Sequence, residues 1–268
     1  MGARDFIIHR NRWVIARSGG CGRTVAAEAV TGRVLNIAHR GASGRFPENT
    51  LAAFGAAIAA GASMCELDVR LSRDGALVVI HDDTVDRTTD GHGPVSGLAL
   101  AELKRLDAGA RFGAQFAGER IPTLAEVFAL LGDRCALNLE IKARGAEPAL
   151  CESIRAHGAL GSALVSSFDW AALAIVRHLE PRARLAPLAS QWPVRLLGAA
   201  TEMGAAAINP RADLVTEDLC IAAHQRNLSV NAWTVDEASE MRRLIACGVD
   251  GIMTNHPERL RELVGEWG

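Results

Sequence analysis

The chain has 268 residues, of which 49% are hydrophobic and 22% charged, so it is long enough for one large α/β domain with a substantial core. Its 29 Lys and Arg against 31 Asp and Glu leave a formal net charge of −2, which provides no electrostatic basis for binding nucleic acid or an anionic membrane. The sequence has no apolar stretch of membrane-helix length and no secretory signal. We therefore expect a cytoplasmic protein without stable membrane insertion.

The first 33 residues differ in composition from the rest, with six arginines, two acidic residues and no clear hydrophobic period. We expect residues 1–33 to be an N-terminal extension, most simply a disordered leader or a misassigned start. An extra strand or helix covering the base of the following domain, or a targeting peptide, are the alternatives. The folded domain is expected to span residues 34–268.

From residue 34 onward, short apolar runs alternate with longer amphipathic stretches, the pattern of βα units and a parallel sheet. The predicted strands are residues 35–39, 64–70, 77–81, 135–141, 163–167, 184–188, 205–209, 228–234 and 251–254. The predicted helices are residues 50–60, 123–131, 147–157, 169–178, 216–226, 236–247 and 257–264. The predicted N-terminal caps are Asn49 or Thr50, Thr123, Asp169, Thr216 and Asp236.

About eight βα repeats in this length favour a closed (β/α)8 TIM barrel over an open doubly wound sheet. Residues 82–121 break the rhythm because they are rich in glycine and lack a repeat period. We expect them to form a small insertion after the second strand region, over one rim of the barrel, where it lines the substrate pocket.

Polar side chains gather at the carboxyl ends of the predicted strands, where barrel enzymes place their active sites. Because side chains alternate along a strand, Glu66 and Asp68 lie on the same face of their strand. In the same way, Asn138, Glu140 and Lys142 lie on one face of the later strand. The alternating positions carry apolar or thiol side chains that can face the helices: Cys65, Leu67, Val69, Leu137, Leu139 and Ile141.

Burying three carboxylates inside a barrel mouth costs free energy unless cations neutralise their charge. A divalent metal bound by Glu66, Asp68 and Glu140 would do so, and all-oxygen ligation suits Mg²⁺ or Ca²⁺ rather than zinc. The alternative is a structural salt-bridge network with the basic side chains Arg40, Arg70 and Lys142.

Two histidines also end predicted strands, at His39 and His81. Either one alone would more often be a hydrogen-bonded structural histidine. Together with the carboxylates, the pair points instead to acid–base chemistry.

The six cysteines lack CxxC spacing, and a core of this size does not need disulfide bonds. We therefore expect reduced, mostly buried thiols at Cys21, Cys65, Cys135, Cys151, Cys220 and Cys247.

Several uncommon motifs follow one another along the chain: His39-Arg40-Gly41, Pro47-Glu48-Asn49-Thr50, Glu66-Leu67-Asp68-Val69, His81-Asp82, Glu140-Ile141-Lys142, Ser167-Phe168-Asp169, Asn231-Ala232-Trp233-Thr234 and the run from Gly248 to Asn255. In these motifs, their order and their spacing, the sequence resembles the glycerophosphodiester phosphodiesterases. The likeness covers about residues 35–260 and includes every core motif. Because the region after His81 is compact, the sequence resembles the bacterial cytoplasmic members of the family.

The resemblance implies metal-dependent hydrolysis of a small-molecule glycerophosphodiester to sn-glycerol 3-phosphate and an alcohol. It implies that Glu66, Asp68 and Glu140 bind the metal and that His39 and His81 form the acid–base pair. It also implies that Arg40 and Lys142 contact the phosphate, where they and the metal can offset charge on its oxygens.

Several assignments stay open from the sequence. Either histidine can be the acid, and either water or the glycerol 2-hydroxyl can attack. Trp233, with Asn231 on the same strand face, lines the glycerol site or simply packs in the barrel. Glu48 binds metal or substrate, or holds His39 and the start of the next helix. The head group, the choice between Mg²⁺ and Ca²⁺ and the oligomeric state leave no signature in the sequence.

Two other functions compete with this one. A lysophospholipase D-like or phosphatidylinositol phospholipase C-like enzyme would use the same groups on a lipid, and would need an exposed apolar lip. The insertion offers only two aromatics for such a lip, Phe112 and Phe116. A non-catalytic binding barrel belongs to a different class, but such proteins usually lose a ligand or a catalytic histidine.

Overall fold

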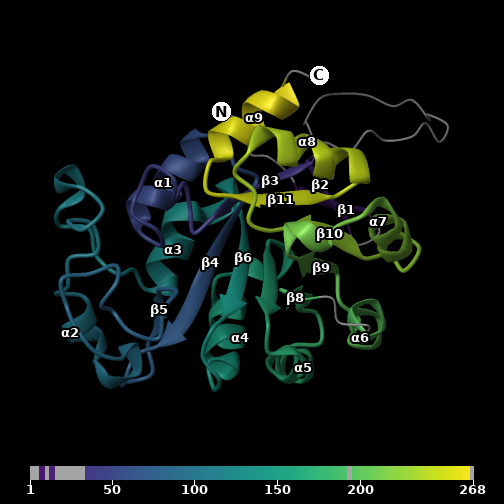
Figure 1. Cartoon of the computed structure of the whole chain (residues 1–268). Helices are drawn as coiled ribbons and strands as arrows, with labels where there is room; N and C mark the ends of the chain where they lie inside the picture. The colour runs from purple at the N-terminus through teal and green to yellow at the C-terminus, as the bar shows by residue number, and fades with distance from the viewer. Residues whose placement is uncertain (1–5, 10–11, 16–33, 192–194, 266–268) are drawn as a thin grey trace, which may run out of the picture.

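The computed structural model describes residues 6–9, 12–15, 34–191 and 195–265. Within them, eight parallel strands close into a barrel in the order β3-β11-β10-β9-β8-β7-β6-β4, and pairing of β3 with β4 completes the ring (Figure 1). The predicted TIM barrel is therefore confirmed. Its strands are β3 (Leu35–His39), β4 (Met64–Leu71), β6 (Ala136–Ile141), β7 (Ala163–Ser167), β8 (Arg184–Ala189), β9 (Ala207–Pro210), β10 (Ser229–Ala232) and β11 (Gly251–Thr254).

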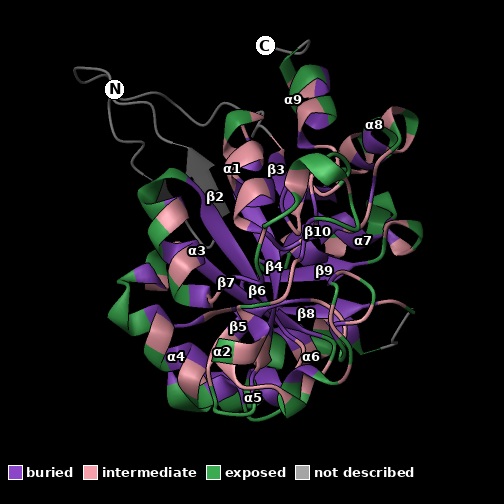
Figure 2. Cartoon of the chain, turned by 90° about the vertical axis from the view of Figure 1, so that its left-hand side faces the viewer, coloured by how far each residue is buried: buried purple, intermediate pink, exposed green. Residues whose placement is uncertain are grey.

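Helices surround the barrel and present their exposed faces outward, while the strands are almost wholly buried (Figure 2). The surrounding α-helices are α1 (Leu51–Ala59), α3 (Leu124–Leu131), α4 (Glu147–Ala156), α5 (Trp170–Leu179), α6 (Leu196–Glu202), α7 (Glu217–His224), α8 (Ala238–Cys247) and α9 (Pro257–Gly265). Short 3-10 turns occupy Val95–Gly97, Ala114–Phe116, Gly132–Arg134, Ala159–Gly161 and Ala212–Leu214. Among the described helices, none is long and apolar enough to span a bilayer.

Side-chain alternation sorts the strands as predicted. The helix-facing core contains Leu67 and Val69 of β4 together with Leu139 and Ile141 of β6. Alternate positions pack in a separate apolar cluster inside the barrel, built from Leu35, Ile37, Met64, Ala136 and Met253. The inward positions nearer the carboxyl ends of the strands are polar, so the barrel interior is apolar at its base and polar at its mouth.

The predicted insertion forms a small lobe beside β4. Strand β5 (Leu77–Val79) pairs antiparallel with the end of β4 and therefore lies outside the barrel ring. Residues 82–121, which include α2 (Leu100–Leu103), have their own hydrophobic cluster. Its buried members are Val78, Ile80, Val85, Val95, Leu103, Ala108 and Ile121.

Four of the predicted helix caps are confirmed, because the side chains of Thr50, Thr123, Asp169 and Thr216 each accept a hydrogen bond from a backbone N–H in the first helical turn. The prediction for Asp236 is wrong. Helix α8 follows Glu237 without a side-chain cap, since the Asp236 carboxylate is occupied by three donors on Thr254 and Asn255.

Two helices escaped the sequence analysis. Helices α2 and α6 are four and seven residues long and follow Ala99 and Arg195, neither of which forms a side-chain cap hydrogen bond. They therefore carry neither a period nor a start signal. Strand β9 begins two residues later than predicted, and β10 ends two residues earlier.

Most of the expected N-terminal extension, residues 1–33, lies outside the described residues. Within it, β1 (Phe6–His9) and β2 (Arg12–Ile15) form a separate antiparallel pair. Cys21 is also outside the described residues. The five described cysteines are free and four of them are buried, as predicted.

Replacing Thr123 with Ala should lower the free energy of unfolding by about 1 kcal/mol, because Thr123 and Glu126 form a reciprocal capping box at the start of α3. Urea denaturation followed by circular dichroism measures this. Thr201→Ala, at an exposed position within α6, is the control and should change stability by less than about 0.5 kcal/mol. Equal effects of the two substitutions would contradict the capping assignment.

Candidate active site

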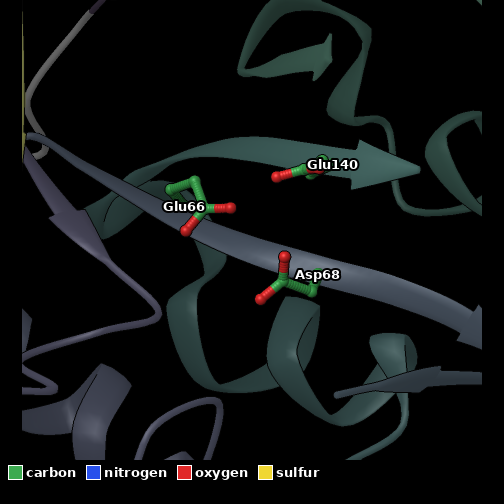
Figure 3. Close-up of side chains that lie close together, drawn as sticks. All are labelled: Glu66, Asp68 and Glu140. Atoms are coloured by element: carbon green, nitrogen blue, oxygen red, sulfur yellow. The ribbon is translucent and has the colours of Figure 1, made fainter. Parts of the chain in front are cut away.

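Three buried carboxylates converge inside the barrel mouth. Glu66 and Asp68 project from β4, and Glu140 projects from the neighbouring strand β6, where Asp68 and Glu140 are directly paired in register. One oxygen from each of the three lies within 4.8 Å of the others, and Figure 3 shows the side chains pointing toward one another. We call these three residues the acidic cluster.

Two basic side chains accompany the acidic cluster. Lys142 Nζ lies 2.6 Å from Glu140 Oε1 and 3.4 Å from Asp68 Oδ1. Arg40 Nε lies 3.4 Å from Asp68 Oδ2, and the Arg40 backbone N–H donates to Glu66 Oε2 at 3.0 Å. Asn49 adds a neutral donor, from its Nδ2 to Asp68 Oδ2 at 2.7 Å.

The three carboxylates respond differently to this setting. Burial, followed by repulsion from Asp68 and Glu140, raises the pKa of Glu66 well above its usual value. Burial and then Asp68 raise the pKa of Glu140 to about 7. Burial also opposes ionisation of Asp68, but Lys142 and Arg40 outweigh it and hold the pKa of Asp68 below its usual value.

The donor set fits a hard divalent cation. All three ligand candidates are carboxylates that are at most 7% exposed, and oxygen ligation of this kind suits Mg²⁺ or Ca²⁺. The alternative of a purely structural ion-pair network is less economical, because two cations face three buried anions. Burial and then carboxylate repulsion raise the pKa of Glu66 and of Glu140 despite those cations. Arg70, the third cation proposed for such a network, instead donates to the His81 carbonyl.

His39 ends β3 beside the acidic cluster, with its Nε2 at 3.9 Å from Glu66 Oε2. Its Nδ1 lies 2.7 Å from Asn255 Oδ1. Asn255 Nδ2 donates to the Asp236 carboxylate at 2.7 Å, so the Asn255 oxygen must face His39 and accept from it. Neutral His39 therefore carries its proton on Nδ1 and a lone pair on Nε2. Burial, followed by the charge of Arg40, lowers the pKa of His39 to about 4.

His81 follows β5 and has a different kind of partner. Its Nδ1 lies 2.6 Å from the Asp82 carboxylate, which can only accept. Arg70 fixes the backbone at this point, because its Nε and terminal nitrogen both donate to the His81 carbonyl, at 2.9 and 2.7 Å. Arg70 also pairs with Asp83.

Glu48 lies among arginines rather than in the acidic cluster. It accepts from Arg40 at 2.9 Å and from two nitrogens of Arg87 at 2.8 Å each. Arg87 belongs to the insertion. Glu48 and His81 both line a small pocket between the insertion and the barrel.

An aromatic pair stands at the rim near Lys142. Phe168 is 44% exposed, its ring meets Trp233 edge-on at 5.4 Å, and Lys142 Nζ lies 5.7 Å from the Phe168 ring centre. Trp233 Nε1 donates to the Asn209 carbonyl. Asn231 is buried in the barrel and bonds to the same residue, with its Nδ2 donating to Asn209 Oδ1 at 3.1 Å.

Sequence reasoning assigned no catalytic or binding role to Asp82, Arg87, Phe168, Asp236 or Asn255. Asp82, Phe168 and Asn255 lie in recognised motifs, so the family pattern could have drawn attention to them. Arg87 lies in no recognised motif, and Asp236 had the local features of a helix cap, so nothing in the sequence indicated their contacts with Glu48 and Asn255.

Comparison with known proteins adds three findings. Residues 39–259 match the glycerophosphoryl diester phosphodiesterase family. The chain is 43% identical over 242 residues to a glycerophosphodiester phosphodiesterase of Caldanaerobacter subterraneus, covering 88% of this chain and 100% of the relative. It is 32% identical over 248 residues to a Bacillus subtilis glycerophosphodiester phosphodiesterase, covering 84% and 85% of the two chains.

Solved structures agree with these relatives. An Oleispira antarctica phosphodiesterase in complex with the product sn-glycerol 3-phosphate has a TM-score of 0.81 and 33% identity, covering 85% of this chain and 96% of that one. A Silicibacter pomeroyi glycerophosphoryl diester phosphodiesterase, described as putative, has a TM-score of 0.81 and 29% identity, covering 87% and 94% of the chains.

In EDTA, Glu140→Gln should gain stability relative to wild type as pH rises from about 5 to 8. The raised pKa of Glu140 means that the folded protein keeps a proton that the unfolded chain releases, so wild type loses stability between the unfolded value, 4.5, and about 7. The advantage of the variant should grow by roughly 2–3 kcal/mol across that window. Urea denaturation at several pH values measures it, with exposed Glu152→Gln as the control. A pH-independent difference between Glu140→Gln and wild type would contradict this account.

Proposed function

The chain belongs to the glycerophosphoryl diester phosphodiesterase family, and we propose that this glycerophosphodiester phosphodiesterase is metal-dependent and releases sn-glycerol 3-phosphate and an alcohol by acid–base catalysis. The observation that carries the proposal is the acidic cluster with its two cations and two flanking histidines at one barrel mouth. The product bound to the Oleispira antarctica relative supports a small-molecule substrate with a glycerol phosphate end.

Glu66, Asp68 and Glu140 would hold the divalent cation. When bound, the cation supplies positive charge next to the nonbridging phosphate oxygens, where charge builds in the transition state. Its presence would also offset the repulsion that raises the pKa of Glu66 and Glu140. The sequence leaves the choice between Mg²⁺ and Ca²⁺ open, and the cytoplasmic location stays a prediction from the sequence.

Arg40 and Lys142 are the proposed phosphate contacts. Each already lies beside Asp68, so a phosphate near the cluster would meet two fixed positive charges. A phosphodiester is anionic and repels nucleophiles, and fixed cations reduce that repulsion without reorganising during the reaction.

His39 is the proposed general base. Its hydrogen bond to Asn255 leaves the Nε2 lone pair free on the side of the acidic cluster, and its lowered pKa keeps the ring neutral at pH 7. A neutral imidazole with an available lone pair can take the proton from the attacking oxygen, whether that oxygen belongs to water or to the glycerol 2-hydroxyl.

His81 is the proposed general acid. Its Nδ1 lies 2.6 Å from the Asp82 carboxylate, which can only accept, so Nδ1 carries a proton and Nε2 faces away from Asp82. Nε2 is then the atom that donates a proton to the leaving alkoxide, which could not depart readily as an anion.

The glycerol end of the substrate would lie against Trp233 and Phe168 next to Lys142. The exposed ring of Phe168 and the half-buried ring of Trp233 suit the carbon atoms of glycerol, while the lysine meets the phosphate. Direct substrate contacts for Asn231 and Glu48 stay predictions from the sequence, and both side chains are already engaged, with Asn209 and with two arginines.

A second candidate is hydrolysis of lysophospholipids at the same site. Phe112 of the insertion is 47% exposed and packs against Phe116, whose ring lies 5.3 Å from that of Phe46. This aromatic group, on the loop that leads to Glu48 and on the insertion, is the apolar feature that a lipid substrate would need.

Hydrolysis of glycerophosphocholine, followed by release of glycerol 3-phosphate, should be lost in EDTA and restored by Mg²⁺ or Ca²⁺. Asp68→Asn should lower activity at limiting metal by at least about 100-fold, because it removes a central ligand. Exposed Asp213→Asn is the matched control. Activity that survives both EDTA and His39→Ala would overturn the mechanism. Faster turnover of lysophosphatidylcholine than of glycerophosphocholine would favour the second candidate.

Asn255→Leu should lower kcat by on the order of 10- to 100-fold, because the acceptor that keeps the His39 proton on Nδ1 is lost. The imidazole nitrogen shifts of His39 in a ¹⁵N NMR experiment report the tautomer directly, and should change in this variant. Gln225→Leu, an equivalent amide-to-leucine change at an exposed site, is the control. If kcat falls while the His39 tautomer is unchanged, Asn255 does not act by keeping the His39 proton on Nδ1.

A further inference from the structure

We propose that Arg87, supplied by the insertion, is a positioning residue that holds His81 through Asp82 and Arg40 through Glu48. This inference rests on the proposed function, in which His81 donates a proton to the leaving group and Arg40 contacts the phosphate. Arg87 itself touches neither group, so its effect on the reaction is transmitted through two carboxylates.

The first carboxylate is Asp82. Arg87 Nε donates to Asp82 Oδ2 at 2.6 Å, and an Arg87 terminal nitrogen donates to Asp82 Oδ1 at 3.0 Å. Asp82 Oδ1 is also the atom that lies 2.6 Å from His81 Nδ1. The two-point contact with the guanidinium fixes the plane of the carboxylate, and therefore the direction from which it accepts the His81 proton.

The second carboxylate is Glu48. The two terminal nitrogens of Arg87 donate to Glu48 Oε1 and Oε2, at 2.8 Å each. Glu48 Oε1 in turn accepts from Arg40 at 2.9 Å. One planar guanidinium thus makes two two-point contacts and joins the histidine on one side of the mouth to the phosphate-contacting arginine on the other.

The backbone that carries Arg87 is firmly held although its side chain is 49% exposed. Val85 and Thr89 flank it, both fully buried, and Thr89 bonds to the Val85 carbonyl through its backbone N–H and its hydroxyl. Val85 belongs to the hydrophobic cluster of the insertion. The fold of the insertion therefore determines where the guanidinium stands.

Charge balance supports the same assignment. Asp82 and Glu48 would repel each other without the cation between them. The hydrogen bonds of Arg87 hold the pKa of Asp82 well below its usual value, so Asp82 stays an anionic acceptor for His81. Ion pairs as exposed as these contribute little to folding stability, which leaves positioning as the larger expected effect of Arg87.

The test compares two phosphodiesters of glycerol that differ in their leaving group, choline and p-nitrophenol. A choline alkoxide needs a proton to depart, whereas p-nitrophenolate leaves without one. Impaired proton donation therefore lowers kcat for glycerophosphocholine much more than for the p-nitrophenyl ester. The variants are Arg87→Met, Arg87→Lys, His81→Ala and the control Arg73→Met, which removes a different arginine bridge, to Glu102 and Gly97.

We expect Arg87→Met to lower kcat for glycerophosphocholine by on the order of 10- to 100-fold and for the p-nitrophenyl ester by less than about 3-fold. KM should rise equally for both, because Arg40 is loosened. The kcat of Arg87→Lys for glycerophosphocholine should lie between those of wild type and Arg87→Met, because the point charge of a lysine cannot reproduce two forked contacts. Arg73→Met should match wild type, and melting temperatures should agree within about 3 °C.

The outcomes separate the two proposals. Suppose that His81→Ala lowers kcat more for glycerophosphocholine than for the p-nitrophenyl ester but Arg87→Met does not. The role of Arg87 is then wrong and the proposed function stands. The same conclusion follows if Arg73→Met behaves like Arg87→Met. Wild-type kinetics of Arg87→Met on both esters would also show that the proposed role of Arg87 is wrong. If His81→Ala lowers both rates alike, His81 is not the acid, and the inference for Arg87 falls with that assignment.

Discussion

An excess of negative charge inside a buried barrel mouth is the constraint on which the rest of the site depends. Three carboxylates of the acidic cluster meet two cations in a region removed from water, where unpaired charge is expensive. Burial, followed by repulsion within the cluster, raises the pKa of both Glu66 and Glu140. A protein that kept such an arrangement for stability alone would do better with apolar side chains, which is why the cluster argues for a bound cation and an anionic substrate.

The two histidines differ in the group that is bonded to Nδ1, and their proposed roles rest on that difference. His39 bonds to a neutral amide whose orientation is imposed by Asp236, and it is buried beside Arg40. His81 bonds to a carboxylate in a more open position. Similar imidazoles can thus serve as base and acid because the groups behind them, rather than the rings themselves, differ.

The insertion changes how the barrel should be viewed. It is a small lobe with its own apolar core, yet its Arg87 reaches both Asp82 and Glu48 at the barrel mouth. The same lobe carries the exposed Phe112, which belongs to the aromatic group proposed to contact a lipid substrate. A segment that looks peripheral in the chain therefore combines contacts to two carboxylates at the barrel mouth with an exposed aromatic side chain.

The sequence alone determined the run of βα units and the inward face of the three carboxylates, because both follow from local periodicity. Alternation along β4 and β6 decides that Glu66, Asp68 and Glu140 face inward while Leu67 and Leu139 face the helices. Only the tertiary structure decided the partners of each polar group. Asp236 illustrates this, since a residue with the local features of a helix cap is used to orient Asn255 instead. Arg87 and Glu48 lie 39 positions apart, and Asn255 and His39 lie 216 apart. Contacts over such separations depend on how the strands close and how the loops fold over them, which no local pattern in one sequence records.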